Sequence, residues 1–374
     1  MKVRNAIGVQ ASWGLALVSL LASCEGDPGA PGGDAHRPPA PIVDCSVSGR
    51  SEPICGFENP EDLVALPGNR ALIVSEYGDI ASSVPGSIAL LRIASRERII
   101  LFRGGRIDAE SAPGWGSPDC PGPPGASFSP HGIDLVRRDD GRLQLLAVQH
   151  GGRESIEFFE VRGEAEAWQV EWRGCLLAPE DASLNDVVGI ADGTLFTTKI
   201  TSLSGGVDFS APPPENDTGQ VYGWSVSRGY WIVPGTSGKM PNGVQATPDG
   251  KTLFMNASLG NEVRKLDVAT GELLGRAAVA FPDNVTWTPD AESLLVASLG
   301  AGDLRDFIAC ENLEAGACPI SFQIIEVDAE TMATSVLFDS VGSPMGAGTV
   351  GLRVGDDLFI GSFRGDRILR VDLR

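Results

Sequence analysis

The chain has 374 residues, of which 42% are hydrophobic and 21% charged, so it is long enough to bury a large core. Its formal net charge of −20 argues against binding to nucleic acids or to anionic lipid headgroups, because like charges repel. Glycine (47 residues) and proline (26 residues) are abundant, which favours many short elements joined by turns over long helices.

The first segment has the pattern of an export signal. Lys2 and Arg4 precede an apolar stretch that is too short and too interrupted to be a good membrane span. The stretch ends in Leu-Ala-Ser-Cys24, which resembles the bacterial lipobox, where the cysteine becomes the lipidated first residue of the mature protein. We therefore predict a lipoprotein signal peptide over residues 1–23. The alternative is an ordinary signal peptide with a chance cysteine.

Residues 24–41 are expected to form the lipidated Cys24 and a flexible tether, because residues 25–41 are rich in glycine and proline and lack an apolar period. Glu25 stands where the commonest inner-membrane retention signal has aspartate, so the predicted location is the outer membrane, at its periplasmic face or on the cell surface. We expect a monomer whose only membrane contact is this lipid anchor.

Six further cysteines suggest disulfides in an exported protein. Cys310 with Cys318 and Cys45 with Cys55 are close enough in sequence to close small loops, and the connectivity is otherwise open. The remaining two are Cys120 and Cys175. No Cys-x-x-Cys pair occurs, which argues against a zinc or redox motif.

One pattern occurs six times between residues 61 and 374: a polar pair, an apolar stretch, a turn and a second apolar stretch. The turns contain Gly, Pro, Asn and Asp, as in Pro248-Asp249-Gly250, and a third strand candidate follows in most copies. The six pairs are Glu61-Asp62, His131-Gly132, Asn185-Asp186, Asn242-Gly243, Asp283-Asn284 and Gly348-Thr349. Six blade-sized repeats predict an all-β, six-bladed β-propeller over residues 42–374. A strand from residues 42–60 is expected to pair with the last blade and close the ring.

The polar pairs are expected to meet at a central-channel metal site, because the first strand of each propeller blade lines the channel. Carboxylate and amide oxygens are the ligands that calcium prefers, whereas zinc prefers His and Cys and magnesium requires a stricter octahedron. The predicted ligands are Glu61, Asn185, Asn242, Asp283 and Asn284. One step along, Asp62 and Asp186 are candidates for a second, structural calcium ion.

Two histidines are candidate catalytic residues. His131 occupies the channel position of its blade, and His150 ends the next strand of the same blade, so hairpin pairing could bring the two rings together. Neutral imidazole is a natural general base for water near pH 7. The competing interpretation is a pair of structural histidines with satisfied hydrogen bonds.

These residues resemble the paraoxonase/arylesterase group within the gluconolactonase-like propellers. The resemblance covers roughly residues 58–373 and is carried by such segments as Pro60–Pro67, Pro130–Ile133, Val148–His150, Leu184–Val187 and Pro241–Val244. It implies a catalytic calcium at the five predicted ligands, a second calcium at Asp62 and Asp186, and a His dyad of His131 and His150. Vertebrate members join their first and last strands by a disulfide, but no cysteine follows Cys318 here, so the ring must close without one.

The predicted function is calcium-dependent hydrolysis of a small-molecule lactone or ester, with water activated by the histidines. The sequence has no Gly-x-Ser-x-Gly nucleophile motif, and Gly346–Gly351 matches a dinucleotide motif in a context of turn and strand. Two alternatives remain open: a non-catalytic, calcium-stabilised surface propeller that binds a ligand or protein, and a quinone-dependent sugar dehydrogenase. Lys199 and the inserts at residues 104–128, 200–219 and 300–320 are expected to shape the channel mouth, so substrate specificity does not follow from the resemblance.

Overall fold

The computed structural model describes residues 40–78, 84–105, 109–165, 167–205, 214–300, 310, 313 and 315–374. The predicted signal peptide, the lipidated Cys24 and nearly all of the tether lie outside these residues, as do parts of the three predicted rim inserts. Within the described residues, no helix has the length and hydropathy needed to span a membrane.

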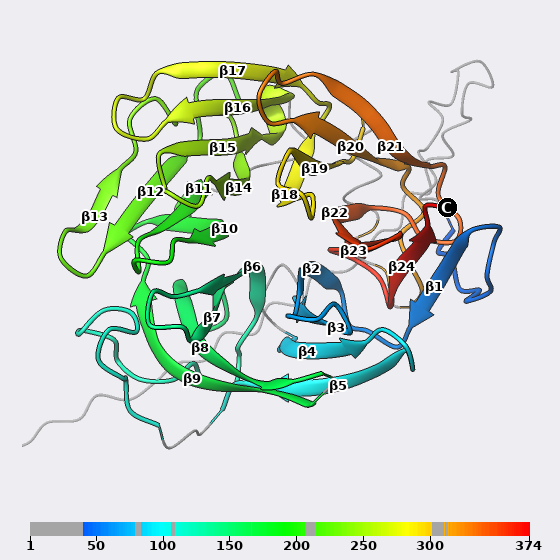
Figure 1. Cartoon of the computed structure of the whole chain (residues 1–374), viewed down its shortest axis with the longest axis horizontal. Coiled ribbons are helices and arrows are strands. Elements are labelled where there is room, and N and C mark those ends of the chain that lie inside the picture. Colours follow the sequence, from blue (N-terminus) through cyan, green and yellow to red (C-terminus); the bar gives the residue numbers. More distant parts are fainter. Residues whose placement is uncertain are drawn as a thin grey trace, which may run out of the picture. The chain divides into compact units, whose positions relative to one another are not determined.

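Six four-stranded antiparallel sheets surround a central axis, which confirms the predicted six-bladed β-propeller (Figure 1). Each predicted polar pair lies on the innermost strand of its blade. The inner strands are β2 (Pro60–Ala65), β6 (Pro130–Arg137), β10 (Ala182–Gly189), β14 (Pro241–Ala246), β18 (Pro282–Trp287) and β22 (Gly348–Val354). The second strands are β3 (Ala71–Glu76), β7 (Leu143–Gln149), β11 (Leu195–Ser202), β15 (Thr252–Ala257), β19 (Ser293–Ser298) and β23 (Asp357–Ser362).

Every blade has two further strands, whereas the sequence pattern predicted a hairpin and one more strand. The third strands are β4 (Ser87–Arg92), β8 (Ser155–Glu164), β12 (Gln220–Ser225), β16 (Glu262–Asp267), β20 (Phe322–Asp328) and β24 (Arg367–Asp372). The outer strands are β5 (Glu97–Phe102), β9 (Ala167–Leu177), β13 (Gly229–Ile232), β17 (Leu273–Ala278), β21 (Thr334–Ser340) and β1 (Ser51–Cys55). Outer strands are difficult to predict because their side chains are largely exposed and alternate poorly, as in β17 and β21.

The ring closes through β1, which pairs with β24 in the last blade, from Ser51 opposite Val371 to Cys55 opposite Arg367. This confirms the predicted closure by the segment before residue 60. Cys45 and Cys55 form a disulfide that fastens the segment before β1, called the arm below (residues 42–50), to the end of β1. Arg367, which is fully buried, donates hydrogen bonds to the carbonyls of Asp44, Pro344 and Ile42. A local disulfide and a buried guanidinium therefore anchor the arm in place of a disulfide between the first and last strands.

The core is divided among the interfaces between neighbouring blades. Within the described residues, each of six buried hydrophobic clusters joins side chains of two adjacent blades. Leu146 and Phe158 of the second blade, for example, pack with Leu184, Leu195 and Trp224 of the third. Burial of these apolar surfaces is the main term that holds the blades at a fixed spacing around the axis.

The structure also contains disulfides Cys310–Cys318, as expected, and Cys120–Cys175, which the sequence left open. Three disulfides are typical of an exported protein. The glycine-rich segment Gly346–Gly351 leads directly into strand β22, so it has the strand context that we expected and opens no helix.

Candidate metal and histidine site

Every inner strand is irregular at its polar pair. The register between the inner and second strands shifts between Pro60 and Asp62 in β2, and between Pro282 and Val285 in β18. The other four inner strands shift at the corresponding position. A bulge releases residues from the hydrogen-bond ladder and redirects their side chains, and such bulges are frequent next to functional sites. The repeated bulge explains how adjacent polar residues on one strand can both face the channel region.

The five predicted metal ligands are buried at this level of the channel, with between 1% (Glu61) and 8% (Asp283) of their surface exposed. Asn284 on β18 donates a hydrogen bond of 2.7 Å to Glu61 Oε1 on β2, so the structure brings two blades that are not neighbours together at the axis. The side chain of Asn242 lies near Asp283, where it lowers the pKa of that carboxyl against the larger raising effect of burial. These contacts place four of the five predicted ligands in two linked pairs.

Four oxygen atoms of this group are buried and have no hydrogen-bond partner among the described residues. They are Glu61 Oε2, Asn185 Oδ1, Asn242 Oδ1 and Asn284 Oδ1. A buried polar atom without a partner costs about 1–3 kcal/mol, and folded proteins contain few of them. Because all four are acceptors, they suit a hard cation or a water molecule and do not suit an anion.

Burial also disfavours the negative charges of this group. Desolvation raises the pKa of Glu61 to about 7, against the lowering effect of the Asn284 hydrogen bond. Desolvation and the nearby Glu61 raise the pKa of Asp283 well above its usual range. A divalent cation would compensate both carboxylates. The described residues contain no cluster of three or more His, Cys, Asp or Glu arranged for a metal, and this site is rich instead in amide oxygens.

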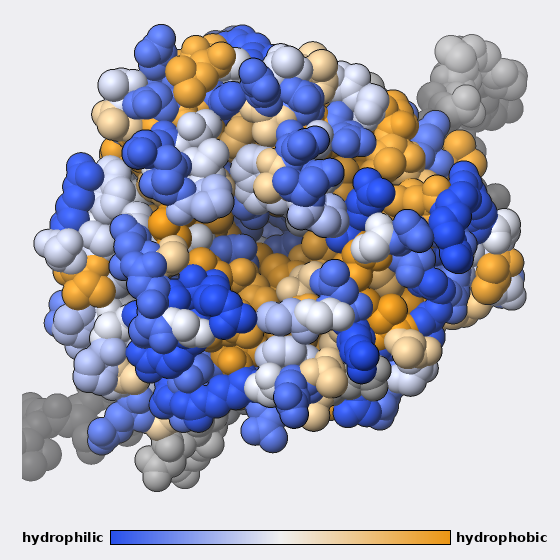
Figure 2. Space-filling model, viewed as in Figure 1, coloured by the Kyte–Doolittle hydropathy of each residue, from blue (hydrophilic) through white to orange (hydrophobic). Residues whose placement is uncertain are grey.

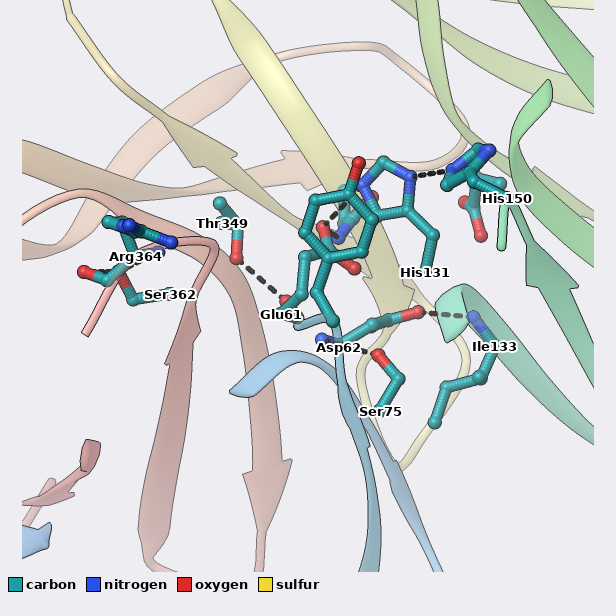
Figure 3. Close-up of polar contacts among 12 residues, drawn as sticks. Glu61, Asp62, Ser75, His131, Ile133, His150, Thr349, Ser362 and Arg364 are labelled. Carbon is teal, nitrogen blue, oxygen red and sulfur yellow. Dashed lines mark hydrogen bonds and ion pairs between the residues drawn. The ribbon is translucent and has the colours of Figure 1, made fainter. Parts of the chain in front are cut away.

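The two predicted histidines lie together, and His131 is beside Glu61 (Figure 3). His131 Nδ1 is 2.9 Å from His150 Nε2, and the other ring nitrogen of His131, Nε2, is 3.5 Å from Glu61 Oε1. Desolvation and the neighbouring His150 lower the pKa of His131 well below its ordinary value. His131 is therefore neutral near pH 7 and can accept a proton.

Two residues of the histidine environment were missed by the sequence analysis. The Tyr77 ring stacks on His131 with a centroid separation of 4.5 Å, and Glu154 lies 2.9 Å from His150 Nδ1. Tyr77 follows the second strand of its blade just as His150 follows the second strand of the next blade, and that equivalence could have identified it. Glu154 has no such repeat signal, because it lies in a loop.

Asp62 and Asp186 differ from their neighbours because backbone amides occupy both of their carboxylate oxygens. Asp62 accepts from Leu63 and Ile133, and Asp186 accepts from Val187 and Val244, at 2.7–2.8 Å. Asp134, missed by the sequence analysis, accepts from Gly189 in the same way, and burial raises its pKa to about 6. These bonds join the first four blades in sequence. The second calcium ion predicted at Asp62 and Asp186 stays a prediction.

The central channel continues beyond the level of the proposed ligands. A cavity of about 320 Å³ is bounded by the later residues of the inner strands, including Leu63, Leu135, Trp287 and Leu352. Figure 2 shows a hollow at the centre of the ring of blades on the face in view, with hydrophobic side chains in it. Lys199, which was expected near the channel mouth, donates a hydrogen bond to Ser202 on its own strand, β11.

Comparison with known proteins gives one family. The model of the arylesterase family matches residues 59–373, which is most of the chain. No curated protein matches the sequence.

Among solved structures, a luciferin-regenerating enzyme has a TM-score of 0.51 at 13% identity, over 85% of this chain and 92% of its own. At that identity the likeness concerns the fold alone. A gluconolactonase from Xanthomonas campestris (TM-score 0.48, 16% identity, 90% and 95% coverage) and the periplasmic gluconolactonase of Pseudomonas aeruginosa (0.46, 14%, 84% and 86%) are also similar.

Proposed function

Because the chain belongs to the arylesterase family, we propose that it is a calcium-dependent hydrolase of carboxylic esters or lactones. The observation that carries the proposal is the set of four buried oxygens that have no partner in the part of the chain that the structure describes. One of them belongs to the Glu61 carboxylate, whose other oxygen lies 3.5 Å from His131 Nε2. An electrophilic site and a neutral base next to each other are the two components that ester hydrolysis by water requires.

The residues fit a calcium ion. Glu61, Asn185, Asn242, Asp283 and Asn284 would hold it through carboxylate and amide oxygens, the ligands that this ion takes in proteins. When bound, calcium supplies a positive charge that polarises a substrate carbonyl and stabilises negative charge on its oxygen. Burial disfavours the ionised forms of Glu61 and Asp283. A bound calcium ion would be attracted by these two carboxylates and would in turn stabilise their negative charges.

The chain's own residues supply the base. His131 Nε2 faces the oxygens of the site, and the stacked Tyr77 ring fixes the plane of the imidazole. A water molecule between His131 and the substrate would lose its proton to Nε2, and the resulting hydroxide would attack the carbonyl carbon. When the bond from that carbon to the leaving-group oxygen breaks, this oxygen would take the proton back from Nε2. His150 Nε2 lies 2.9 Å from His131 Nδ1 and, as an acceptor, would stabilise the imidazolium that forms.

The test uses the full-length chain in detergent, with phenyl acetate and with short-chain and long-chain lactones as substrates. Turnover is expected in calcium, is expected to disappear after chelation, and is expected to return when calcium is added. His131→Gln should lower kcat by about 10²- to 10⁴-fold, the range that general-base catalysis contributes. Glu160→Gln is the control, since Glu160 pairs with Arg162 and Arg173 on β8 and β9 and touches no residue of the site.

Two results would reject the proposal. Full activity of His131→Gln would remove the proposed base. If no substrate is hydrolysed although calcium raises the melting temperature, the ion site remains and the protein is a calcium-stabilised binding propeller. A redox-dye assay with added quinone then checks for the dehydrogenase alternative.

A further inference from the structure

The loop between β7 and β8 carries a buried carboxylate that the proposed mechanism does not use. The side chain of Glu154 is 10% exposed, and both of its carboxylate oxygens are 2.9 Å from His150 Nδ1. No arginine or lysine is among its hydrogen-bond or ion-pair partners within the described residues, in contrast to Glu157 and Glu160 of the adjoining strand. Its environment is therefore that of a group directed at a histidine rather than of a structural ion pair.

The position of this carboxylate determines which nitrogen carries the proton in each ring. An ionised carboxylate only accepts hydrogen bonds, so His150 Nδ1 must be the protonated nitrogen. His150 Nε2 is then the acceptor for His131 Nδ1, 2.9 Å away. His131 Nδ1 consequently carries its proton, and the lone pair of His131 is on Nε2, the nitrogen that lies 3.5 Å from Glu61 Oε1.

The same carboxylate also reaches the next blade. The backbone amide of Leu184 on β10 donates a hydrogen bond of 2.6 Å to Glu154 Oε1. The register of β10 against β11 shifts on both sides of Leu184, and the following residue is Asn185, whose Oδ1 has no partner. Glu154 therefore connects the histidine pair to the strand segment that carries a proposed calcium ligand.

We propose that Glu154 is a positioning residue that sets the tautomers of His150 and His131 and holds them in register with Asn185. No proton moves to Glu154 in this role. The kinetic consequence rests on the proposed hydrolase function, whereas the tautomers and the register are properties of the folded chain that can be measured without substrate.

Glu154→Gln is the informative variant, because it keeps the size of the side chain. Its amide oxygen can still accept from Leu184 and still reaches His150 Nδ1, but its NH₂ group, in the place of Oε2, faces Nδ1 as a competing donor and so disfavours the native tautomer. Glu154→Asp keeps the charge on a shorter side chain and should restore part of the effect. Glu160→Gln is the matched control, a buried carboxylate of the same blade that bonds only to arginines among the described residues.

The first readout is nitrogen NMR of the full-length chain labelled only at histidine, which is practicable because the sequence has three histidines. The expected result is His150 protonated on Nδ1 in the unmodified chain and in Glu160→Gln, and a mixed or reversed tautomer in Glu154→Gln. His131→Gln and His36→Gln assign the signals. A His150 protonated on Nε2 in the unmodified chain, or an unchanged tautomer in Glu154→Gln, would overturn the proposal.

The second readout is steady-state kinetics with saturating calcium. Glu154→Gln should lower kcat by about 10- to 100-fold, as loss of a carboxylate behind a functional histidine typically does, with little change in KM. Glu154→Asp should lie between this variant and the unmodified chain. A lower melting temperature with an unchanged kcat would show a structural role only and would overturn the proposal. If the unmodified chain hydrolyses nothing, the hydrolase function fails, and the NMR result alone decides the role of Glu154.

Discussion

Glu61 and Asp62 are neighbours on β2, yet their surroundings differ in one decisive respect. Both oxygens of Asp62 accept hydrogen bonds from backbone amides, one of them on the adjacent blade, whereas Oε2 of Glu61 has no partner among the described residues (Figure 3). Asn185 and Asp186 on β10 repeat this contrast, residue for residue.

This difference in hydrogen bonding shows that adjacent residues of one inner strand have two different roles. The aspartates are saturated by backbone donors and join successive inner strands, so their contribution is to the fold. The other members of the pairs are left with acceptors that the fold does not satisfy, at a cost in free energy. Such a cost is expected to persist where a ligand compensates it. The proposed ligands therefore differ from the structural carboxylates in whether their oxygens have hydrogen-bond partners, and not in residue type.

Replacement of the neighbours on β10 gives the largest expected effects. Asp186→Ala would leave the amides of Val187 and Val244 without acceptors and should lower the free energy of unfolding by about 2–4 kcal/mol. Asn185→Ala removes an oxygen that has no partner among the described residues, so it should destabilise the metal-free protein much less than Asp186→Ala does, while calcium binds at least about 10-fold more weakly. Denaturant unfolding with and without calcium measures both.

If Asn185→Ala destabilises the metal-free protein as much as Asp186→Ala does, the proposed distinction between ligand and structural residues is wrong. The same experiment tests the predicted second ion. Equal destabilisation of Asp186→Ala in calcium and in chelator indicates that its role is hydrogen bonding, and greater destabilisation in calcium indicates that it binds the second ion.

The pH dependence of the metal-free protein should be the next largest effect. Burial raises the pKa of Glu61 from 4.5 to about 7, so the folded metal-free chain keeps a proton that the unfolded chain releases. Its stability should therefore fall as the pH rises from about 4.5 through 7. Bound calcium compensates the ionised carboxylate, so the difference in melting temperature between calcium-loaded and calcium-depleted protein should widen from pH 5 to pH 8. A difference that is independent of pH would contradict this reasoning.

Removal of one hydroxyl should have the smallest effect. Thr349 on β22 donates a hydrogen bond of 2.7 Å to the carbonyl of Glu61, and Thr286 on β18 makes a similar bond to Gly351. Thr349→Val and Thr286→Val should each lower the free energy of unfolding by about 1 kcal/mol. Only Thr349→Val should also weaken calcium binding, by a few-fold, since only this bond holds a proposed ligand. Equal calcium affinities in the two variants would show that the backbone of Glu61 needs no such support.

The architecture could be predicted from the sequence because its strongest signal is repetition. Each inner strand begins with a polar pair, and the turn after it has residues that tolerate positive φ, such as Gly250 in the fourth blade. The predicted ligands share one offset in successive repeats, so the circular fold brings them to one depth. Outer strands such as β13 lack the pattern, because their residues are half-exposed or exposed on both faces and show no apolar alternation.

The remaining parts of the site could not be predicted for identifiable reasons. Glu154 acts from a loop, where no strand periodicity marks its direction, and its contacts depend on the neighbouring blade. Cys120 and Cys175 are 55 residues apart, and their pairing depends on how the long segment before β6 folds over the second blade. The saturation of Asp62 and Asp186 by backbone amides depends on the bulges, which are visible only in three dimensions.

A crystal structure of the full-length chain grown in calcium would test the central claim most directly. The proposed function predicts an ion with ligand distances of about 2.3–2.6 Å to Glu61 Oε2, Asn185 Oδ1, Asn242 Oδ1, Asn284 Oδ1 and a carboxylate oxygen of Asp283. Density for water alone at that position, with the asparagine amides rotated to hydrogen-bond one another, would contradict it.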